Sequence, residues 1–264
     1  MVPSRSSTLA ALLLASCACA CGSASSGSGA TARTTATADP LSGSLTVFAA
    51  ASLTEAFSDA KRRLLAAHPH VSITDSFAGS QTLVAQVENG APADVIATAD
   101  TATMAKLVAA RLVGTPRTFA RNRLEIVVAP GNPKHVTGLA DLARPDLKVV
   151  LEDPSVPAGR YGRQALQAQG VTARPVSLPL DVRSELLAVE QGNADAGIVY
   201  VTDVAAAGAA VTGVAIPGSE NIIATYPVAV VTATRNHAAA QAFVQDLISG
   251  VGHRSLAARG FLAP

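Results

Sequence analysis

Small and hydroxyl-bearing residues recur in this chain where an apolar, strand-like segment runs into a helical pattern. Ser52 follows the apolar run at 45–51, and Ser80 follows the run at 71–77. At a helix N-terminus, the unpaired backbone N–H groups and the positive end of the helix dipole favour a bound anion. The chemistry that these two serines predict is therefore hydrogen bonding to a small oxyanion.

Five junctions share this pattern, in which a strand or turn delivers small or hydroxyl residues to the first turn of a helix. Besides those of Ser52 and Ser80, the junctions contain Pro157-Ala158-Gly159, Asp181-Val182-Arg183 and Tyr200. In open α/β sheets, ligands bind outside the carboxyl ends of the strands, where the helices begin. We therefore expect the junctions to converge from two lobes and to form a cage of hydroxyl and N–H groups around one anion.

Several of these residues also suit helix capping. Ser52 and Glu55 form an S-x-x-E capping box, so we expect Ser52 both to cap its helix and to face the anion. Ser80 and Asp181 are each suited to the N-cap position, and Pro157 suits the first helical position.

Two arginines, Arg160 and Arg183, lie beside the junctions. We expect them to be solvated surface charges, because arginine is mostly exposed in proteins. The alternative is that they raise the local positive potential. The cage itself does not need either one as a direct ligand.

The elements that must position these residues alternate between strand-like and helical patterns, which indicates βαβ units and parallel sheets. The expected strands are 45–50, 71–77, 94–98, 124–129, 148–151, 176–178, 197–200 and 226–231. The expected helices are 54–67, one that carries Leu83, Val84 and Val87, and 101–110, 139–142, 162–169, 182–190, an Ala-rich stretch ending near 216, and 238–250. The runs 124–129 and 226–231 bracket the second series, so we expect them to cross between two lobes that hinge and close.

Composition excludes several classes of protein. The 264 residues carry a net charge of +1 with both signs scattered, so there is no electrostatic footprint for nucleic acid. Ser58 and Lys61 match the S-x-x-K of exported Ser-Lys hydrolases, but no S-D-N or K-T-G accompanies them. The five histidines lack metal-ligand spacing. We therefore expect a monomer with no catalytic residues, no cofactor and no direct metal-cation site.

The N-terminus is typical of an export signal, with Arg5 ahead of an apolar run at 9–15. All three cysteines, Cys17, Cys19 and Cys21, lie just beyond it, which favours lipid attachment over a disulfide framework. Leu14-Ala-Ser-Cys17 resembles the bacterial lipobox, which predicts a signal peptide at 1–16 and lipidation of Cys17. Cys21 is the alternative, with a signal at 1–20, and cleavage without lipidation is a third possibility.

Residues 17–43 are rich in Ser, Gly, Thr and Ala and predict a flexible tether. We expect an exported protein, lipid-anchored at the extracytoplasmic face of the cell membrane, in the periplasm or on the outer face of the cytoplasmic membrane.

Seven stretches together resemble the substrate-binding proteins of molybdate ABC transporters, the ModA type. The resemblance extends from about residue 45 to 264 and depends on the order of the stretches. They are Val47-Phe-Ala-Ala-Ala-Ser-Leu-Thr54, Phe77-Ala-Gly-Ser80, Gly90-Ala-Pro-Ala-Asp94, Asp153-Pro-Ser-Val-Pro-Ala-Gly159, Asp181-Val-Arg183, Gly197-Ile-Val-Tyr200 and Tyr226-Pro-Val-Ala-Val-Val231.

The resemblance implies an α/β, two-lobed periplasmic-binding-protein fold of type II, with two crossover strands as the hinge and the ligand in the interlobe cleft. Lobe 1 would comprise 44–125 plus 228–264, and lobe 2 would comprise 126–227. The implied partners are the oxyanion, and the membrane permease and ATPase of an ABC transporter. The implied ligand is molybdate, or tungstate, bound only as the oxyanion.

The same resemblance implies the roles of five residues. Ser52 and Ser80 would supply hydroxyl and N–H donors from lobe 1, Ala158 and Val182 main-chain N–H donors from lobe 2, and Tyr200 a phenolic donor. Three positions depart from the family's pattern, because relatives often have serine at the positions of Gly79 and Gln81, and glycine at that of Val201.

Two other functions stay open at this stage. One is a binding protein of the same fold for another tetrahedral oxyanion such as sulfate, because pattern reasoning cannot measure a cavity. The more distant one is the exported Ser-Lys hydrolase.

Overall fold

A computed structural model describes residues 41–264 of the chain. The predicted signal peptide, the lipidation site at Cys17 or Cys21, and the tether up to residue 40 lie outside the described residues. Within 41–264, no helix is both long enough and apolar enough to cross a membrane.

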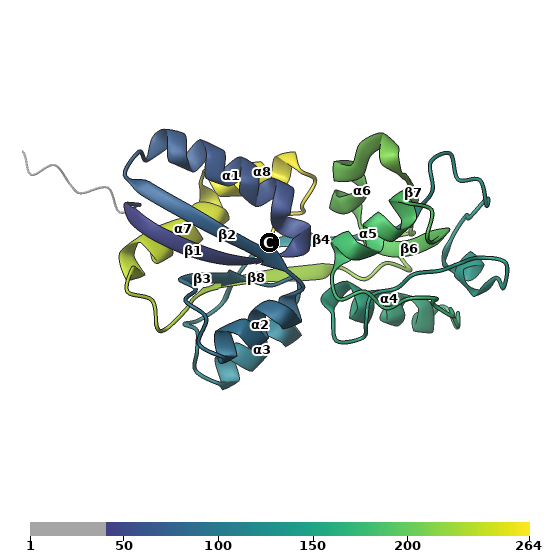
Figure 1. The fold of residues 1–264 in the computed structure, drawn as a ribbon, viewed down its shortest axis with the longest axis horizontal. Helices are drawn as coiled ribbons and strands as arrows, with labels where there is room; N and C mark the ends of the chain where they lie inside the picture. Colours follow the sequence, from purple (N-terminus) through teal and green to yellow (C-terminus); the bar gives the residue numbers. More distant parts are fainter. Residues whose placement is uncertain (1–40) are drawn as a thin grey trace, which may run out of the picture. The chain divides into compact units, whose positions relative to one another are not determined.

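A five-stranded sheet forms the first lobe, in the order β2-β1-β3-β8-β4 (Figure 1). The pairs β1–β2 and β1–β3 are parallel, whereas β8 is antiparallel to both β3 and β4. The strands are β1 (Gly43–Ala50), β2 (Val71–Ala78), β3 (Val95–Ala97), β4 (Arg117–Asn122) and β8 (Ala224–Val230).

Both faces of this sheet are covered by helices because β1 is apolar on both sides. Val47 packs in the same core as Phe57 of α1 and Phe243 of α7, whereas the adjacent Phe48 packs with Leu83 of α2 on the other face. This alternation is the two-residue period of a strand buried on both sides. The helices of this lobe are η1 (Ala51–Leu53), α1 (Thr54–Ala67), α2 (Ser80–Glu88), α3 (Thr101–Ala109), α7 (His237–Ser249) and α8 (Val251–Ala258).

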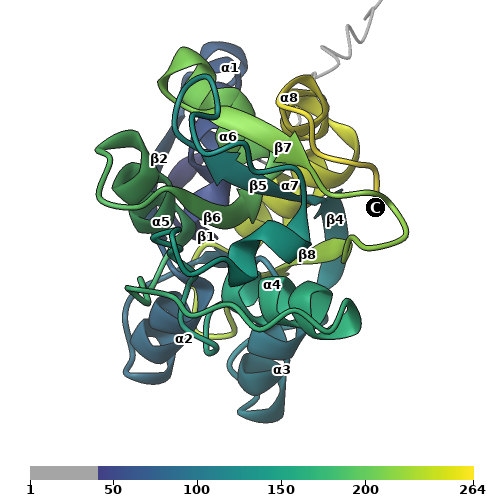
Figure 2. The same ribbon diagram turned by 90° about the vertical axis from the view of Figure 1, so that its right-hand side faces the viewer.

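The second lobe contains an antiparallel sheet in the order β6-β5-β7 (Figure 2). Two single bridges extend it, since Val149 pairs in parallel with Ala196 of β6, and Val150 pairs in parallel with Ser177. Its elements are β5 (Leu124–Val128), η2 (Leu139–Ala143), α4 (Pro157–Ala168), α5 (Val182–Glu190), β6 (Ala196–Tyr200), α6 (Val201–Ala207), η3 (Gly208–Ala210) and β7 (Thr212–Ala215).

With these bridges included, the second sheet repeats the order and direction of the first. The segments around 177 and 150, then β6, β5 and β7, correspond to β2, β1, β3, β8 and β4. In both sheets the first two neighbouring pairs are parallel and the last two are antiparallel. The chain passes to the second sheet between β4 and β5 and returns between β7 and β8. The residue boundaries of the two lobes remain predictions.

Several predicted elements need correction. The expected strands at 148–151 and 176–178 are single bridges, because Pro175 and Pro179 flank the second segment and have no N–H for a ladder. The expectation of parallel sheets is wrong for β3–β8, β4–β8, β5–β6 and β5–β7, which are antiparallel. The Ala-rich helix ends at Ala207, and β4, β7 and α8 did not appear among the predicted elements.

Candidate functional site

The five predicted site residues come together around one small cavity between the lobes. The space open to the centre of a water-sized sphere is about 10 Å³. This is far smaller than the corresponding volume of a pocket for an organic ligand. None of its lining residues is a lysine or an arginine. The lining consists of Ala50, Ala51, Ser52, Gly79, Ser80, Ala99, Glu152, Val156, Pro157, Ala158, Asp181, Val182 and Tyr200.

Ser52 bonds to a tyrosine rather than to its own helix. The chain leaves β1 through the 3-10 turn η1, which places Ser52 within the turn, and neither η1 nor α1 has a side-chain cap. The Ser52 Oγ lies 3.0 Å from the Tyr226 Oη, and both residues are buried. The capping-box prediction is therefore wrong, and Glu55 pairs instead with Arg183.

Ser80 is the first residue of α2, whose N-cap is Gly79. The prediction that Ser80 is the N-cap is therefore wrong. Its Oγ accepts a hydrogen bond from the Ala99 N–H at 3.0 Å, just beyond the end of β3. Because a hydroxyl group carries one proton, Ser80 can still donate that proton to a neighbouring acceptor.

The start of α4 approaches the preceding backbone closely. Pro157 is the first helical residue, as its residue type predicts, so the helix begins at 157 and not at the expected 162. A Cβ on Gly159 would lie 2.3 Å from the Asp153 carbonyl oxygen, so only glycine fits there. The Gly159 N–H donates to Glu152 Oε2 at 3.0 Å. The Ala158 N–H belongs to the first helical turn and so has no partner within the helix.

The start of α5 confirms the predicted cap. The Asp181 Oδ1 accepts from the Ser184 N–H at 2.9 Å, and its Oδ2 accepts from the Ser184 hydroxyl at 2.8 Å. Val182 is the first residue of the helix, so its N–H also lacks a helical partner.

Tyr200 ends β6 and carries a hydroxyl group with no hydrogen-bond partner among residues 41–264. The side chain is only 1% exposed. Burial raises the pKa of Tyr200 well above its usual value, and Tyr226 and Glu152 raise it further. The phenol therefore stays protonated and is available as a neutral donor at the cavity.

Three buried carboxyl groups lie at and behind the cavity. Glu185 Oε2 accepts from the Glu152 N–H at 2.8 Å, and its Oε1 accepts from the Ile198 N–H at 2.6 Å. Burial raises the pKa of both Glu152 and Glu185 well above the usual value. Burial likewise raises the pKa of Asp203 to about 7, although the hydrogen bond from the Tyr200 N–H lowers it.

Ion pairs join the two lobes beside the cavity. The Arg160 Nε donates to Asp100 Oδ2 at 3.1 Å, and its Nη2 donates to Asp100 Oδ2 and, at 2.8 Å, to Thr103 Oγ1. Arg183 Nη1 lies 2.9 Å from Glu55 Oε1. The expectation of a solvated surface charge is wrong for Arg160, which pairs with the buried Asp100, whereas Arg183 stays 40% exposed while it pairs with Glu55 of the opposite lobe.

A neutral contact also joins the lobes. The Gln81 Nε2 donates to the Leu180 carbonyl oxygen at 2.7 Å. The conformation is therefore one in which the two lobes touch on both sides of the cavity.

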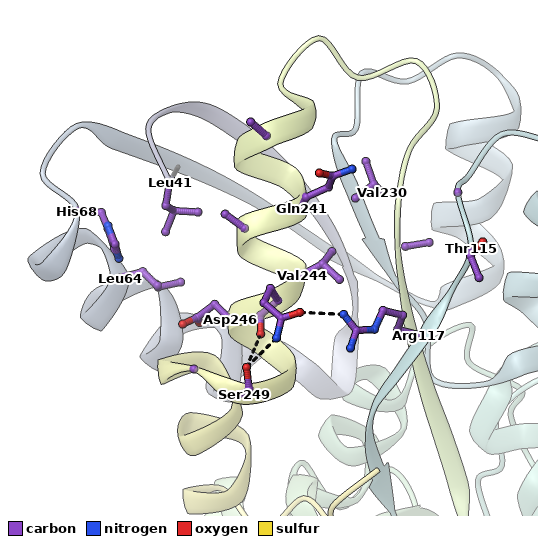
Figure 3. Close-up of a pocket in the computed structure, with 16 residues that line it drawn as sticks. Leu41, Leu64, His68, Thr115, Arg117, Val230, Gln241, Val244, Asp246 and Ser249 are labelled. Atoms are coloured by element: carbon purple, nitrogen blue, oxygen red, sulfur yellow. Dashed lines mark hydrogen bonds between the residues drawn. The ribbon is translucent and has the colours of Figure 1, made fainter. Parts of the chain in front are cut away.

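A larger groove of about 910 Å³ lies on the first lobe, along α7 (Figure 3). Its polar side chains bond mainly to one another, as Arg117 does to Gln245 at 2.9 Å and Gln245 to Ser249 at 2.8 Å. None of the five predicted site residues lines it. Size alone therefore does not identify the candidate site.

Two residues of the cavity lining, Ala99 and Glu152, are absent from the sequence predictions. Tyr226 bonds to Ser52 from outside the lining; it belongs to one of the seven stretches above but has no predicted role at the site. A charge directly after the apolar run Val149-Val150-Leu151 was the available signal for Glu152, whereas nothing local indicates that Tyr226 meets Ser52.

The Ser58–Lys61 pattern has a different explanation. Lys61 Nζ lies 3.0 Å from Asp75 Oδ2, and Ser58 is exposed on α1. Among residues 41–264 no cluster of His, Cys, Asp and Glu is arranged to hold a metal ion.

Comparison with known proteins identifies the family of the chain. The sequence model of the bacterial extracellular solute-binding proteins matches residues 45–262. The chain belongs to this family. As a solute-binding protein it is a carrier of its ligand, not an enzyme.

This solute-binding protein is 42% identical over 230 residues to the molybdate-binding protein ModA of Mycobacterium tuberculosis, covering 86% of this chain and 88% of that protein. Two solved structures share the fold. The periplasmic molybdate-binding protein of Azotobacter vinelandii aligns with a TM-score of 0.70 at 21% identity, covering 83% of this chain and 99% of that one. The sulfate-binding protein SubI of Mycobacterium tuberculosis aligns with a TM-score of 0.71 at 24% identity, covering 83% and 86%.

The hydrogen bond between Ser52 and Tyr226 should appear as an energetic coupling. We expect Ser52→Ala and Tyr226→Phe each to lower the free energy of unfolding by about 1 kcal/mol, and the double variant to lose less than the sum by about 0.5–1.5 kcal/mol. Urea unfolding of the four proteins measures this coupling. Strictly additive losses would mean that the two hydroxyl groups do not stabilise each other.

Asp203 should make the stability of the protein depend on pH. An unfolded aspartate ionises near pH 4, whereas Asp203 in the folded protein keeps its proton up to about pH 7. Its contribution to stability is therefore lost as the pH rises from about 4 to about 7. We expect Asp203→Asn to gain stability relative to the parent between pH 5 and pH 8, as measured by urea unfolding.

Asp141→Asn serves as the control for this experiment. Hydrogen bonds from Thr137 hold the pKa of Asp141 below its usual value, so the difference in stability between this variant and the parent should stay constant between pH 5 and pH 8. Parallel pH profiles for Asp203→Asn and the parent would contradict the assignment.

Proposed function

We propose that this protein captures molybdate, and tungstate as its near twin, outside the cytoplasm and delivers it to an ABC permease driven by an ATPase. The observation that carries the proposal is the convergence of Ser52, Ser80, Ala158, Val182 and Tyr200 on one cavity sized for a small ion. The named relative at 42% identity supports molybdate as the ligand.

The proposed ligands are neutral donors. Ser52 and Ser80 would supply hydroxyl groups from the first lobe, and Ala158 and Val182 would supply N–H groups from the second. Tyr200 would supply its unpaired phenol. Because α2, α4 and α5 begin at the cavity, their dipoles would favour the anion without any lysine or arginine in the lining.

Closure of the two lobes would complete the cage. The anion would first meet the donors of one lobe, and the other lobe would then swing in to exclude water. Arg160 with Asp100, and Arg183 with Glu55, would hold the closed form at the edges of the cleft.

We further propose that the protein is held at the extracytoplasmic face by lipid on Cys17, or on Cys21, and acts as a monomer. The cysteines and the small residues around them are the support for the anchor. Membership of the extracellular solute-binding proteins is consistent with export.

Sulfate remains the second candidate ligand. The fold is shared with a protein named as sulfate-binding, and sulfate and molybdate are both unprotonated dianions that differ mainly in size. The higher identity to a protein named as molybdate-binding favours molybdate.

Calorimetric titration of the purified protein with molybdate, tungstate, sulfate and phosphate at one ionic strength tests the substrate. We expect molybdate and tungstate to bind most tightly. Tyr200→Phe should weaken molybdate binding about ten- to a hundredfold, since a hydrogen bond to a charged group is worth about 1.5–3 kcal/mol.

The same variant gives a control on stability. Because the Tyr200 hydroxyl group interacts only with Tyr226 and makes no well-formed hydrogen bond among the described residues, Tyr200→Phe should lose less than about 1 kcal/mol of stability without the anion. Ser58→Ala, which removes an exposed hydroxyl group on α1 outside the cavity lining, should bind as the parent does. Sulfate binding more tightly than molybdate would overturn the choice of ligand.

The ion pairs between the lobes should contribute unequally to affinity. Arg160 bonds to the buried Asp100, whose side chain is 3% exposed, whereas the side chains of Arg183 and Glu55 are 40% and 28% exposed. We expect Arg160→Gln to weaken anion binding about tenfold and Arg183→Gln to weaken it less than about fivefold, because exposed pairs are screened by water and salt.

Calorimetry of both variants at low and high salt measures this difference. Equal affinities of Arg160→Gln and the parent would mean that the Arg160–Asp100 pair does not stabilise the closed form.

A further inference from the structure

A buried carboxyl group lines the cavity and has no part in the proposed set of donors. Glu152 is 1% exposed. Its Oε2 accepts the Gly159 N–H, whereas its Oε1 has no hydrogen-bond partner among residues 41–264. No ion pair within this part of the chain includes Glu152. An ionised carboxylate in this position would be desolvated and unpaired, which costs several kcal/mol.

The charges around Glu152 are mostly of its own sign. Glu185 and Asp181 face it from α5, and Asp203 from α6. The phenol of Tyr200, at the end of β6, is also close to it. The guanidinium of Arg163, on α4, donates to the carbonyl oxygens of Glu152 and Gly159, at 2.8 and 3.2 Å, rather than to the carboxyl group.

This environment favours the neutral form of the side chain. Burial, and then the proximity of Glu185, raise the pKa of Glu152 well above its usual value. A neutral carboxylic acid has one O–H donor, and an ionised carboxylate has none. Next to a dianion, the neutral carboxylic acid attracts the anion through its O–H group, whereas the ionised carboxylate repels it.

We propose that Glu152 is a sixth ligand of the anion and binds it as a neutral carboxylic acid, donating the Oε1–H to an oxygen of the anion. The inference rests on the proposed function and deepens it. When Glu152 is ionised in the free protein, capture of the dianion takes one proton from solvent, and that proton forms the O–H bond on Glu152. No other bond forms or breaks.

Because protonation of Glu152 and binding of the anion are linked, the affinity should depend on pH. Above the pKa of Glu152 in the free protein, the dissociation constant for the dianion should rise by up to about tenfold for each pH unit. The number of protons taken up per bound anion should rise toward one over the same range.

The test is calorimetric titration of the full protein with molybdate, from about pH 6 to about pH 9, in buffers of different ionisation enthalpy. The dependence of the observed heat on the buffer gives the number of protons taken up. Above the pKa of Glu152 we expect uptake in the parent and in Asp203→Asn, which excludes Asp203 as the group that takes up the proton; the comparison with Glu152→Gln distinguishes Glu152 from Glu185, whose pKa burial also raises. Glu152→Gln keeps an N–H donor but has no titratable group, so it should bind molybdate without this uptake and with a flatter pH profile.

The outcomes separate the two proposals. If the parent takes up no proton because Glu152 is neutral over the whole range, a Glu152→Leu variant that binds molybdate as tightly as the parent would overturn the role of Glu152. Uptake in Glu152→Gln equal to that of the parent would overturn it as well. No heat with molybdate in the parent would instead contradict the proposed function itself.

Discussion

The cavity between the lobes depends on one constraint, which is that a charge taken out of water needs hydrogen-bond partners fixed in place. The groups available as such partners in this cavity are neutral. Hydroxyl groups and first-turn N–H groups line the space, and no lysine or arginine does. Neutral donors are already oriented by the helices that carry them, so closing the cleft around an anion does not require a cationic side chain to lose its own hydration.

The same constraint explains the arrangement of the two sheets. A single sheet brings helix starts to only one edge, and donors on one side leave the rest of an anion exposed. The second sheet repeats the order and directions of the first, with single bridges at 150 and 177 in place of full strands. Two such edges that face each other surround the cavity, and the chain passes between the sheets only after β4 and before β8.

Charged groups occupy separate places around this neutral lining. The arginines Arg160 and Arg183 lie at the edges, where each pairs with a carboxylate of the other lobe. Glu152, Glu185 and Asp203 are buried behind or beside the donors, and burial raises the pKa of each. Carboxyl groups that keep their protons add polar contacts without adding the negative charge that would repel an anion.

Local sequence determined most of the helix starts and most of the regular elements, because apolar period, caps and turns act over a few residues. It also determined the five junctions and the cap by Asp181, whereas the five site residues within the junctions came from the family resemblance. Only the tertiary structure decided that Ser52 bonds to Tyr226, 174 positions away, instead of capping its helix, and that Arg160 pairs with Asp100. It alone decided that Glu152 is buried with one oxygen unpaired. These contacts join residues that are far apart in the sequence and depend on how the two sheets pack. A pattern that extends over a few residues cannot predict them.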